Sequence, residues 1–246
     1  MLEVQQLTIQ AGNTVLVDNL SLDLAEGRLT CLIGPSGCGK SSVIKWLSGV
    51  LAPDLDVQGR ACINGAIEPL PHRDIAYQPQ QDTLFPWLTI TENVSLGLEV
   101  RGLGRTAARE KLRGLFAHFG LAGHEGSFPD QLSGGMRQRA AFLRTIVQDA
   151  RVLLLDEPFS ALDAVTRLRM QDWLMARLRE QPRAVLMVTH DLYEATQMAD
   201  RVIVMAGHPG RIIANIPITI PYAERCEATL ADIRSTLKSM LIKDTS

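Results

Sequence analysis

Residues 34–41, Gly-Pro-Ser-Gly-Cys-Gly-Lys-Ser, constrain the fold of this chain more than any other stretch. The apolar run 29–33 before them predicts a short buried strand, and residues 42–47 after them predict the first turns of a helix. Glycines let such a turn approach an anion closely, while its N–H groups and the positive helix end face that anion. The complete spacing G-x-x-x-x-G-K-S therefore predicts a site for nucleotide phosphates.

Lys40 and Ser41 have separate tasks in this turn. A lysine here is a point charge for the β- and γ-phosphates, and a serine hydroxyl is a ligand for Mg²⁺. The alternative is an ordinary glycine-rich turn with a solvated lysine, which the strand and helix on either side disfavour. The residues expected to hold the nucleotide are Gly34, Pro35, Ser36, Gly37, Cys38, Gly39, Lys40, Ser41 and Ser42.

A second predicted strand ends in two acidic side chains. The apolar run Val152–Leu155 is followed by Asp156 and Glu157. Two charges at the end of a buried strand need partners, and a metal ion and a polarised water are such partners. We expect Asp156 to hold Mg²⁺, directly or through water, and Glu157 to accept a proton from the attacking water. Two exposed acids in a loop are the alternative.

The segment Leu132–Arg139 begins a predicted helix with Ser-Gly-Gly. Ser133 can cap that helix, and the glycines leave N–H groups exposed. Alone this is an ordinary helix start. A single phosphate turn, however, leaves the γ-phosphate open to water on one side, so we expect this helix start to close the site of a second copy. Arg137 and Arg139 are expected to be solvated or paired at that interface.

Composition narrows the classes of protein further. A net charge of −2 shows no basic excess, so we expect no nucleic-acid partner. The four cysteines form no C-x-x-C pair, which favours reduced thiols over disulfides or a zinc site. Neither a signal-peptide pattern nor an apolar run near the roughly 18 residues of a membrane span is visible. We expect a chain that is soluble by itself, which leaves docking on a membrane protein open.

Strands and helices alternate in a pattern that indicates an α/β core. Turns in residues 1–33 suggest antiparallel strands that lead into the phosphate turn, and residues 57–77 suggest further strands. Alternation later in the chain predicts a largely parallel sheet covered on both faces. The later elements are strand 152–155, helix 165–180, strand 184–188, helix 191–199 and strand 202–205.

Between these parts the sequence becomes helical. Thr89–Glu92 has the spacing of a capping box. Ala108, Leu112, Leu115 and Phe119 recur as one helix face, and residues 136–149 carry another apolar stripe. We therefore divide the chain into a nucleotide-binding core (1–81 and 150–220), a helical lobe (82–149) and a C-terminal tail of one or two helices (221–246).

The order of these segments, with Ser160–Asp163 and Thr189–His190 after them, resembles ATP-binding subunits of ABC transporters over residues 2–216. The resemblance implies a P-loop ATPase core of the α/β class, with a mostly parallel sheet, an N-terminal antiparallel β subdomain and an inserted α-helical lobe. It also implies hydrolysis of ATP to ADP and phosphate, coupled to transport across a membrane.

The resemblance assigns roles to single residues. Gln80 would contact Mg²⁺ and the attacking water, although Gln78 competes for this role, and His190 would contact the γ-phosphate. Asp163 would lie at the seam of a dimer of two copies. The expected catalytic residues are thus Glu157, His190 and Gln80; the metal ligands are Ser41, Gln80 and Asp156; and the residues that bind the nucleotide of the opposite copy are Ser133, Gly134 and Gly135, with Asp163 beside them.

One departure concerns the nucleobase. Members of this family usually have an aromatic residue near the N-terminus that stacks on adenine, whereas Ala11 stands near that place here. No aromatic residue precedes Trp46. We therefore expect weak selectivity for the base.

Two segments, 84–89 and 208–212, look like the importer branch that handles nitrate, sulfonates, taurine and pyrimidine precursors of thiamine. This implies a bacterial importer with ATP and Mg²⁺ as cofactors, at the cytoplasmic face of the inner membrane. Integral membrane permease subunits would dock near Phe85, Pro86 and Trp87, and a periplasmic or lipoprotein solute-binding protein would act indirectly. Core packing of the lobe is the alternative for these three residues.

Two other functions stay open. A soluble ABC-type ATPase that acts on DNA or ribosomes usually has two cassettes or long coiled-coil insertions, and neither is visible. A P-loop kinase for small molecules would need an acceptor pocket, but it would not need the Ser-Gly-Gly helix start.

Overall fold

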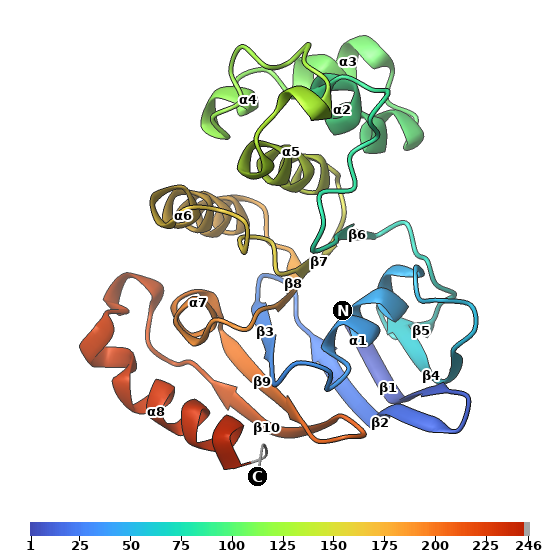
Figure 1. Cartoon of the computed structure of the whole chain (residues 1–246), viewed down its shortest axis with the longest axis vertical. Helices are drawn as coiled ribbons and strands as arrows, with labels where there is room; N and C mark the ends of the chain where they lie inside the picture. The colour runs from blue at the N-terminus through green and yellow to red at the C-terminus, as the bar shows by residue number, and fades with distance from the viewer. Residues whose placement is uncertain (244–246) are drawn as a thin grey trace.

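The computed structural model describes residues 1–243 and contains two sheets. The larger sheet has the strand order β10-β9-β3-β8-β7-β6 (Figure 1). The five strands β9, β3, β8, β7 and β6 are parallel to one another, and β10 is antiparallel to β9. Their bounds are β3 Leu29–Ile33, β6 Ile75–Gln78, β7 Val152–Asp156, β8 Ala184–Val188, β9 Arg201–Ala206 and β10 Arg211–Pro217. The mostly parallel α/β core is therefore confirmed.

Both faces of the larger sheet are covered, and every residue of β3, β7 and β8 is buried. Alternate residues face different cores, as the period of a strand requires. On one face Cys31, Leu153 and Met187 pack with helices that include α5 and α7. On the other face Leu32 and Leu154 pack with α1 and the smaller sheet. This double burial explains the continuous apolar runs of the sequence.

The smaller sheet is antiparallel, as expected for the N-terminal part of the chain, and has the order β2-β1-β4-β5. Leu2, Leu7 and Ile9 of its first strand are fully buried. The sheet stacks beside α1 and against the larger sheet, which fixes the phosphate turn between them. The elements are β1 Leu2–Ala11, β2 Thr14–Leu24, α1 Lys40–Ser48, β4 Asp56–Ile63 and β5 Ala66–Ile67.

Helices that lie together at the top of Figure 1 follow β6. They are α2 Ile90–Val100, α3 Arg105–Lys111, α4 Leu115–His118, the 3₁₀ helix Pro129–Gln131 and α5 Gly134–Ile146. The capping box is present: Thr89 accepts from Glu92 N, and the Glu92 side chain accepts from Thr89 N. The helical nature of this region agrees with the prediction; the boundaries of a separate lobe stay a prediction.

The prediction of one continuous helix face from Ala108 to Phe119 is wrong. The helix stops at Lys111, and Gly114 adopts φ 81°, a left-handed conformation that ends one helix and precedes the next. Ala108, Leu112 and Phe119 are nevertheless buried. The apolar spacing thus predicted correctly which residues are buried, whereas the left-handed conformation of Gly114 determined where one helix ends and the next begins.

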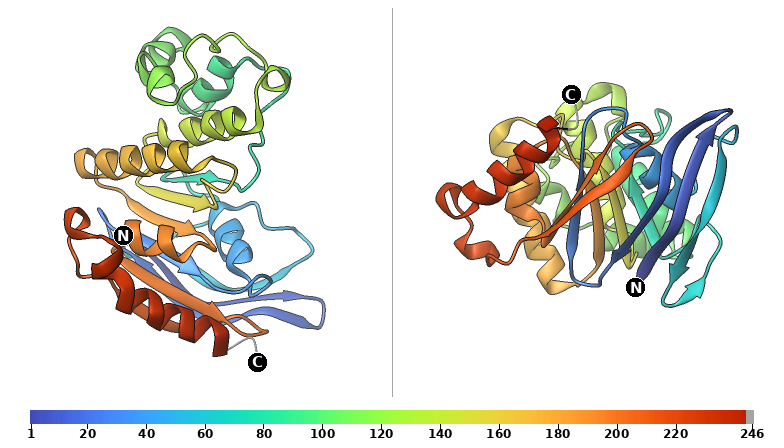
Figure 2. Two further views of the ribbon diagram at one scale, coloured as in Figure 1. Left: turned by 60° about the vertical axis from the view of Figure 1, so that its left-hand side comes forward. Right: turned by 90° about the horizontal axis from the view of Figure 1, so that it is seen from below.

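The C-terminal part packs on the larger sheet at the opposite end of the molecule from α2 and α3 (Figure 2). Its long helix α8 contacts α7 and β9, with Leu230 and Leu237 fully buried. The C-terminal helices are α7 Leu192–Met198, the 3₁₀ helix Tyr222–Glu224 and α8 Glu227–Lys243, while α6 Ala164–Glu180 lies beside α5 (Figure 1). The predicted tail therefore has one long helix and one short one; residues 244–246 lie outside the described residues.

Within residues 1–243, no helix combines the length and the apolar character that crossing a bilayer requires. The four cysteines are unpaired thiols, of which only Cys226 is exposed. The strand β10, which the sequence did not predict, is an edge strand with alternating half-buried residues. Its weak apolar pattern explains why it was missed.

Candidate functional site

The turn between β3 and α1 requires glycine at defined places. Gly37 and Gly39 have φ values of 85° and 91°, which residues with a side chain rarely adopt. A Cβ at Gly39 would lie 2.5 Å from Val17 Cγ2, and one at Gly34 would lie 2.3 Å from Met205 O. The turn is therefore closely surrounded by β2 and β9, which hold its backbone at the start of α1.

Lys40 places its charge within this turn. Its side chain is nearly buried, and Nζ donates to Gly34 O at 2.9 Å and to Pro35 O at 2.7 Å. These carbonyls fix the ammonium where it adds to the positive end of α1. The turn thus combines backbone N–H groups, a helix start and a fixed cation, which suits a bound phosphate chain.

Asp156, the last residue of β7, lies beside the turn and is 3% exposed. Burial, and next the charge of Glu157, raise its pKa to about 6, while Lys45, the Ser41 hydroxyl and Lys40 oppose this. The positive groups around the carboxylate therefore do not offset the effects of burial and of the Glu157 charge.

A magnesium ion would supply further positive charge. Mg²⁺ prefers oxygen ligands and is usually held by one or two protein groups together with substrate phosphates. The predicted ligands, the Ser41 hydroxyl, the Asp156 carboxylate and the amide oxygen of Gln80, would each offer an oxygen to such an ion. Among residues 1–243 no three His, Cys, Asp or Glu side chains form a metal cage.

Three predicted catalytic side chains meet at the carboxyl ends of the central strands. Glu157 Oε2 accepts a hydrogen bond from Gln80 Nε2 at 3.1 Å, and Glu157 Oε1 lies 3.2 Å from His190 Nδ1. Glu157 itself has φ 48°, and its N–H donates to Val188 O at 2.9 Å. A strained backbone that neighbouring strands hold in place is common at functional sites. These residues follow β6, β7 and β8, so the parallel order of the sheet brings them together.

The two candidate glutamines lie in different surroundings. Gln78 is fully buried, and its Oε1 accepts from the Thr145 hydroxyl of α5 at 2.8 Å. Gln80, two residues later, reaches Glu157. The structure therefore brings Gln80, and not Gln78, to the acidic strand end.

The Ser-Gly-Gly segment forms a separate group. Ser133 caps α5, since its Oγ accepts from Met136 N at 3.3 Å. A Cβ at Gly134 would find only the end of Arg137 within 4 Å, and one at Gly135 would lie 3.7 Å from Ala161 O. Asp163 caps α6 and is exposed. Within residues 1–243 neither cap makes a hydrogen bond with the phosphate turn.

Comparison with known proteins identifies the arrangement. The sequence profile described as "ABC transporter" matches residues 17–160, more than half of the chain. The chain belongs to the ABC transporter family. It is the ATP-binding and ATP-hydrolysing subunit of such a transporter, as the sequence predicts.

Several relatives of this ABC protein have specific names. It is 34% identical to the formylaminopyrimidine import ATP-binding protein ThiZ of Halalkalibacterium halodurans, over 95% of this chain and 93% of that protein. It is 37% identical to the aliphatic sulfonates import ATP-binding protein SsuB 2 of Burkholderia cenocepacia, over 92% of this chain and 82% of that protein. A dimeric post-hydrolysis structure of the ATP-binding cassette MJ0796 with ADP and Pi superimposes with a TM-score of 0.79 at 26% identity, over 90% of this chain and 100% of that chain.

In this ABC cassette the structure adds one residue to the candidate site. A cavity of about 420 Å³ lies beside the phosphate turn, between the β1–β2 hairpin and the β9–β10 turn. His208 lines it, and its Cε1 lies 3.3 Å from the place of a Cβ on Gly37. Hydrogen bonds from Gly210 N to Leu16 O and from Asp18 N to Gly210 O, each 3.0 Å, hold the two turns together. The sequence marked 208–212 only as a branch feature, because this proximity is a tertiary contact.

Two further expectations for the cassette concern its surface. Trp87 is 70% exposed, and its ring lies 5.4 Å from that of half-exposed Phe85. Core packing alone therefore does not account for this pair. Arg137 differs from the expectation: its Nε pairs with Asp82 at 3.0 Å within the chain, because residues 82–84 run along α5. The ion pair lies within one chain, and 35% of the Arg137 side chain stays exposed.

Proposed function

We propose that this chain powers a bacterial importer: it hydrolyses ATP to ADP and phosphate and drives the uptake of a small solute through a membrane partner. The observation that carries this proposal is the carboxylate of Glu157, which receives Gln80 and approaches His190 beside the phosphate turn. A base, two groups that orient it and an anion site at one strand edge are what hydrolysis of a phosphoanhydride needs.

In the proposed reaction the phosphate chain lies on residues 34–42, with the Lys40 ammonium near the β- and γ-phosphates. Glu157 accepts the proton of the attacking water, and its two partners hold the carboxylate in one orientation. His190, with 68% of its side chain exposed, is free to turn toward the γ-phosphate. Mg²⁺, held by Ser41, Asp156 and the Gln80 amide oxygen, would neutralise phosphate charge.

A second copy completes the site in this proposal. Ser133, Gly134 and Gly135 present the open start of α5, and Asp163 lies nearby at the start of α6. Since these groups make no hydrogen bond with the phosphate turn of their own chain, they suit the γ-phosphate bound by the opposite copy. The dimeric state of the cassette MJ0796 supports such an assembly.

The nucleobase is proposed to lie in the 420 Å³ cavity against His208. An imidazole ring offers a face on which a base stacks, and Ala11 offers none. Stacking alone accepts every base. Weak selectivity for adenine therefore remains the proposal.

The exposed Phe85–Trp87 pair supports docking of integral membrane permease subunits at the entry to α2. With such subunits the chain lies peripherally at the cytoplasmic face of the inner membrane, and a periplasmic or lipoprotein solute-binding protein delivers the solute. The proposed solute is of the nitrate, sulfonate, taurine or pyrimidine-precursor type. The names of ThiZ, for formylaminopyrimidine import, and of SsuB 2, for aliphatic sulfonates import, support the pyrimidine and sulfonate members of this group.

Glu157→Gln tests the proposal. The amide keeps the shape but cannot accept the proton, so ATPase activity should fall by at least about a hundredfold, while ATP binding persists. Sedimentation at saturating ATP should show a dimer. Glu180→Gln, at the exposed end of α6, is the control and should hydrolyse ATP normally. A Glu157→Gln chain that stays monomeric with ATP, or a wild type that transfers phosphate to a small acceptor, would favour the kinase alternative.

A further inference from the structure

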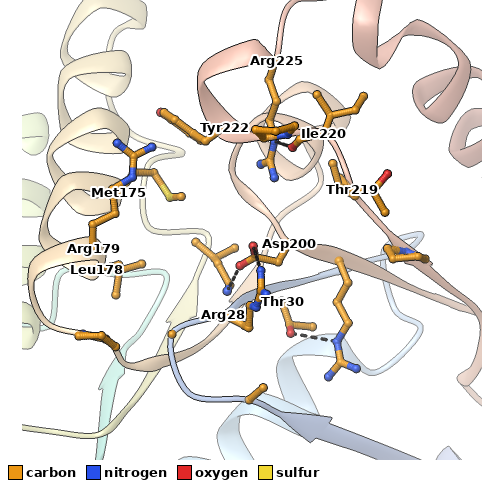
Figure 3. A pocket seen from close by; sticks show the side chains of 18 of the residues that line it. Arg28, Thr30, Met175, Leu178, Arg179, Asp200, Thr219, Ile220, Tyr222 and Arg225 are labelled. Carbon is orange, nitrogen blue, oxygen red and sulfur yellow. Dashed lines mark hydrogen bonds and ion pairs between the residues drawn. The ribbon is translucent and has the colours of Figure 1, made fainter.

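A cavity of about 880 Å³ lies far from the phosphate turn, at the amino ends of β3 and β9 (Figure 3). Its walls come from the last turns of α6, from the strand starts and from residues 217–225, which lead to α8. The volume falls in the range of sites for small molecules. Nothing in the proposed ATPase cycle uses this space.

Cationic side chains outnumber acidic ones around the cavity: four arginines and two aspartates line it. Arg28 pairs with Asp200 at 2.9 Å, and Arg201 pairs with Asp23 at 3.0 Å. Arg179 and Arg225 have no carboxylate partner among the described residues, which leaves an excess of two positive charges.

The arginines differ in how firmly they are held. Arg225 donates to Ile220 O at 2.9 Å and to Gln197 O at 2.8 Å, so its place is fixed. Arg179 lies 5.0 Å over the ring of Tyr222, and no described residue accepts a hydrogen bond from it. Its donors are therefore open to an oxyanion, which a guanidinium binds with two parallel hydrogen bonds.

Besides Thr30, Thr219 and Tyr222, the uncharged lining of the cavity is mostly apolar. Met175 and Leu178 of α6 line the cavity together with Ile218 and Ile220 of the segment before α8. Figure 3 shows Met175, Leu178 and Arg179 on one wall, with Tyr222, Ile220 and Arg225 on the facing one. An inorganic ion would leave these apolar walls unused, whereas an anion with a hydrocarbon part would cover them.

We propose that this cavity binds a small organic anion, with a carboxylate or sulfonate group on an aliphatic body. The acid group lies at Arg179, near the excess positive charge, and the aliphatic part lies on Met175, Leu178 and Ile220. Because one wall belongs to the segment before α8, the bound anion joins the C-terminal tail to the core.

Titration calorimetry on the full chain tests the proposal with four probes. Hexanesulfonate and heptanoate share the body and differ in the acid group, sulfate lacks the body, and hexyltrimethylammonium has the opposite charge. At least one of the two organic anions should bind at one site per chain. Sulfate should bind at least about tenfold more weakly, and the cation should not bind.

Variants locate the site. Arg179→Gln should lower the affinity for the organic anion by about tenfold or more, since it removes charged hydrogen bonds. Arg169→Gln, an exposed arginine on the same helix that does not line the cavity, is the matched control and should leave affinity unchanged. The proposal is overturned if neither organic anion binds, if both variants behave alike, or if Lys40→Ala rather than Arg179→Gln abolishes binding.

Discussion

At the scale of single residues, Asp156 and Glu157 are adjacent in sequence but lie in different surroundings. Asp156 is buried at the end of β7, while Glu157 has turned out of the strand with a left-handed φ. Neighbouring carboxylates with unlike environments take different roles. The buried one suits a metal ligand, and the one that faces Gln80 and His190 suits a base.

Burial of Asp156 has a consequence for stability without metal. Its pKa rises from about 4 in the unfolded chain to about 6 in the folded one, so the folded chain binds this proton more tightly. The group therefore destabilises the folded state above pH 6 and has no effect below pH 4. Replacement by a neutral side chain should remove the penalty.

Urea unfolding with a chelator present checks this. Asp156→Asn should be more stable than wild type at pH 7 by at most about 3 kcal/mol, with the gain shrinking toward pH 4. Asp54→Asn, at an exposed aspartate, is the matched control and should change the free energy of unfolding by less than about 0.5 kcal/mol. Equal gains at pH 4 and pH 7 for Asp156→Asn would show that charge is not the cause.

His208 gives a second prediction at this scale. If the nucleobase stacks on its ring, His208→Ala should lower the affinity for ATP by about fivefold. Tripolyphosphate, which has no base, should bind as tightly as to the wild type. His208→Phe should restore ATP binding, and His118→Ala, an exposed histidine on α4, should change nothing. Affinity can be measured by calorimetry with ATP, GTP and tripolyphosphate. GTP binding far weaker than ATP would contradict the proposed weak selectivity.

At the scale of elements, the start of α5 combines a cap with an open surface. Ser133 stabilises the helix through Met136 N, and the neighbouring glycines leave space above it. A substitution can test separately the two proposed roles of Ser133, which are capping the helix and binding a phosphate. Aspartate caps a helix as well as serine does, but its charge repels a phosphate.

Ser133→Asp should therefore keep the free energy of unfolding within about 0.5 kcal/mol of wild type. Combined with Glu157→Gln, it should abolish the dimer that forms at saturating ATP. Thermal unfolding and sedimentation measure the two effects. The matched control is Ser133→Asn in the same Glu157→Gln background, which has the shape of the aspartate and retains a good cap without adding a charge. A dimer that still forms with Ser133→Asp would show that the start of α5 does not bind the γ-phosphate of the opposite copy.

At the scale of the whole molecule, one apolar core continues from the central sheet into the C-terminal tail. Leu230 and Leu237 of α8 are fully buried in the same cluster as Leu153 and Met187 of the sheet. The tail therefore contributes to the stability of the fold.

Leu237→Ala should lower the free energy of unfolding by about 2–5 kcal/mol, because it leaves a cavity in this core. Leu168→Ala, which removes the same atoms from a leucine that is 61% exposed, should cost less than about 1 kcal/mol. Denaturant unfolding of both variants is the measurement. A small effect at Leu237 would mean that α8 is only loosely attached.

What the sequence determined is local. The glycine turn, the apolar strand that ends in two acids, the capping box and the buried positions of each helix follow from backbone conformation and hydrophobic period, which neighbours in the chain specify. These features were sufficient for the fold class and for most of the candidate site. Glu157 and His190, for example, each stand two residues after the end of a strand that the sequence predicts.

The tertiary structure decided the contacts between distant segments. It turned Gln80 toward Glu157 and Gln78 toward Thr145, placed His208 beside Gly37, paired Arg137 with Asp82 and gathered four arginines around one cavity. Such contacts depend on how sheets and helices pack. The burial of apolar surface drives this packing, and because it is non-directional, the sequence pattern does not say which segments will be neighbours. Local patterns therefore predicted the parts of the site, while the packing of the sheet decided which side chains meet.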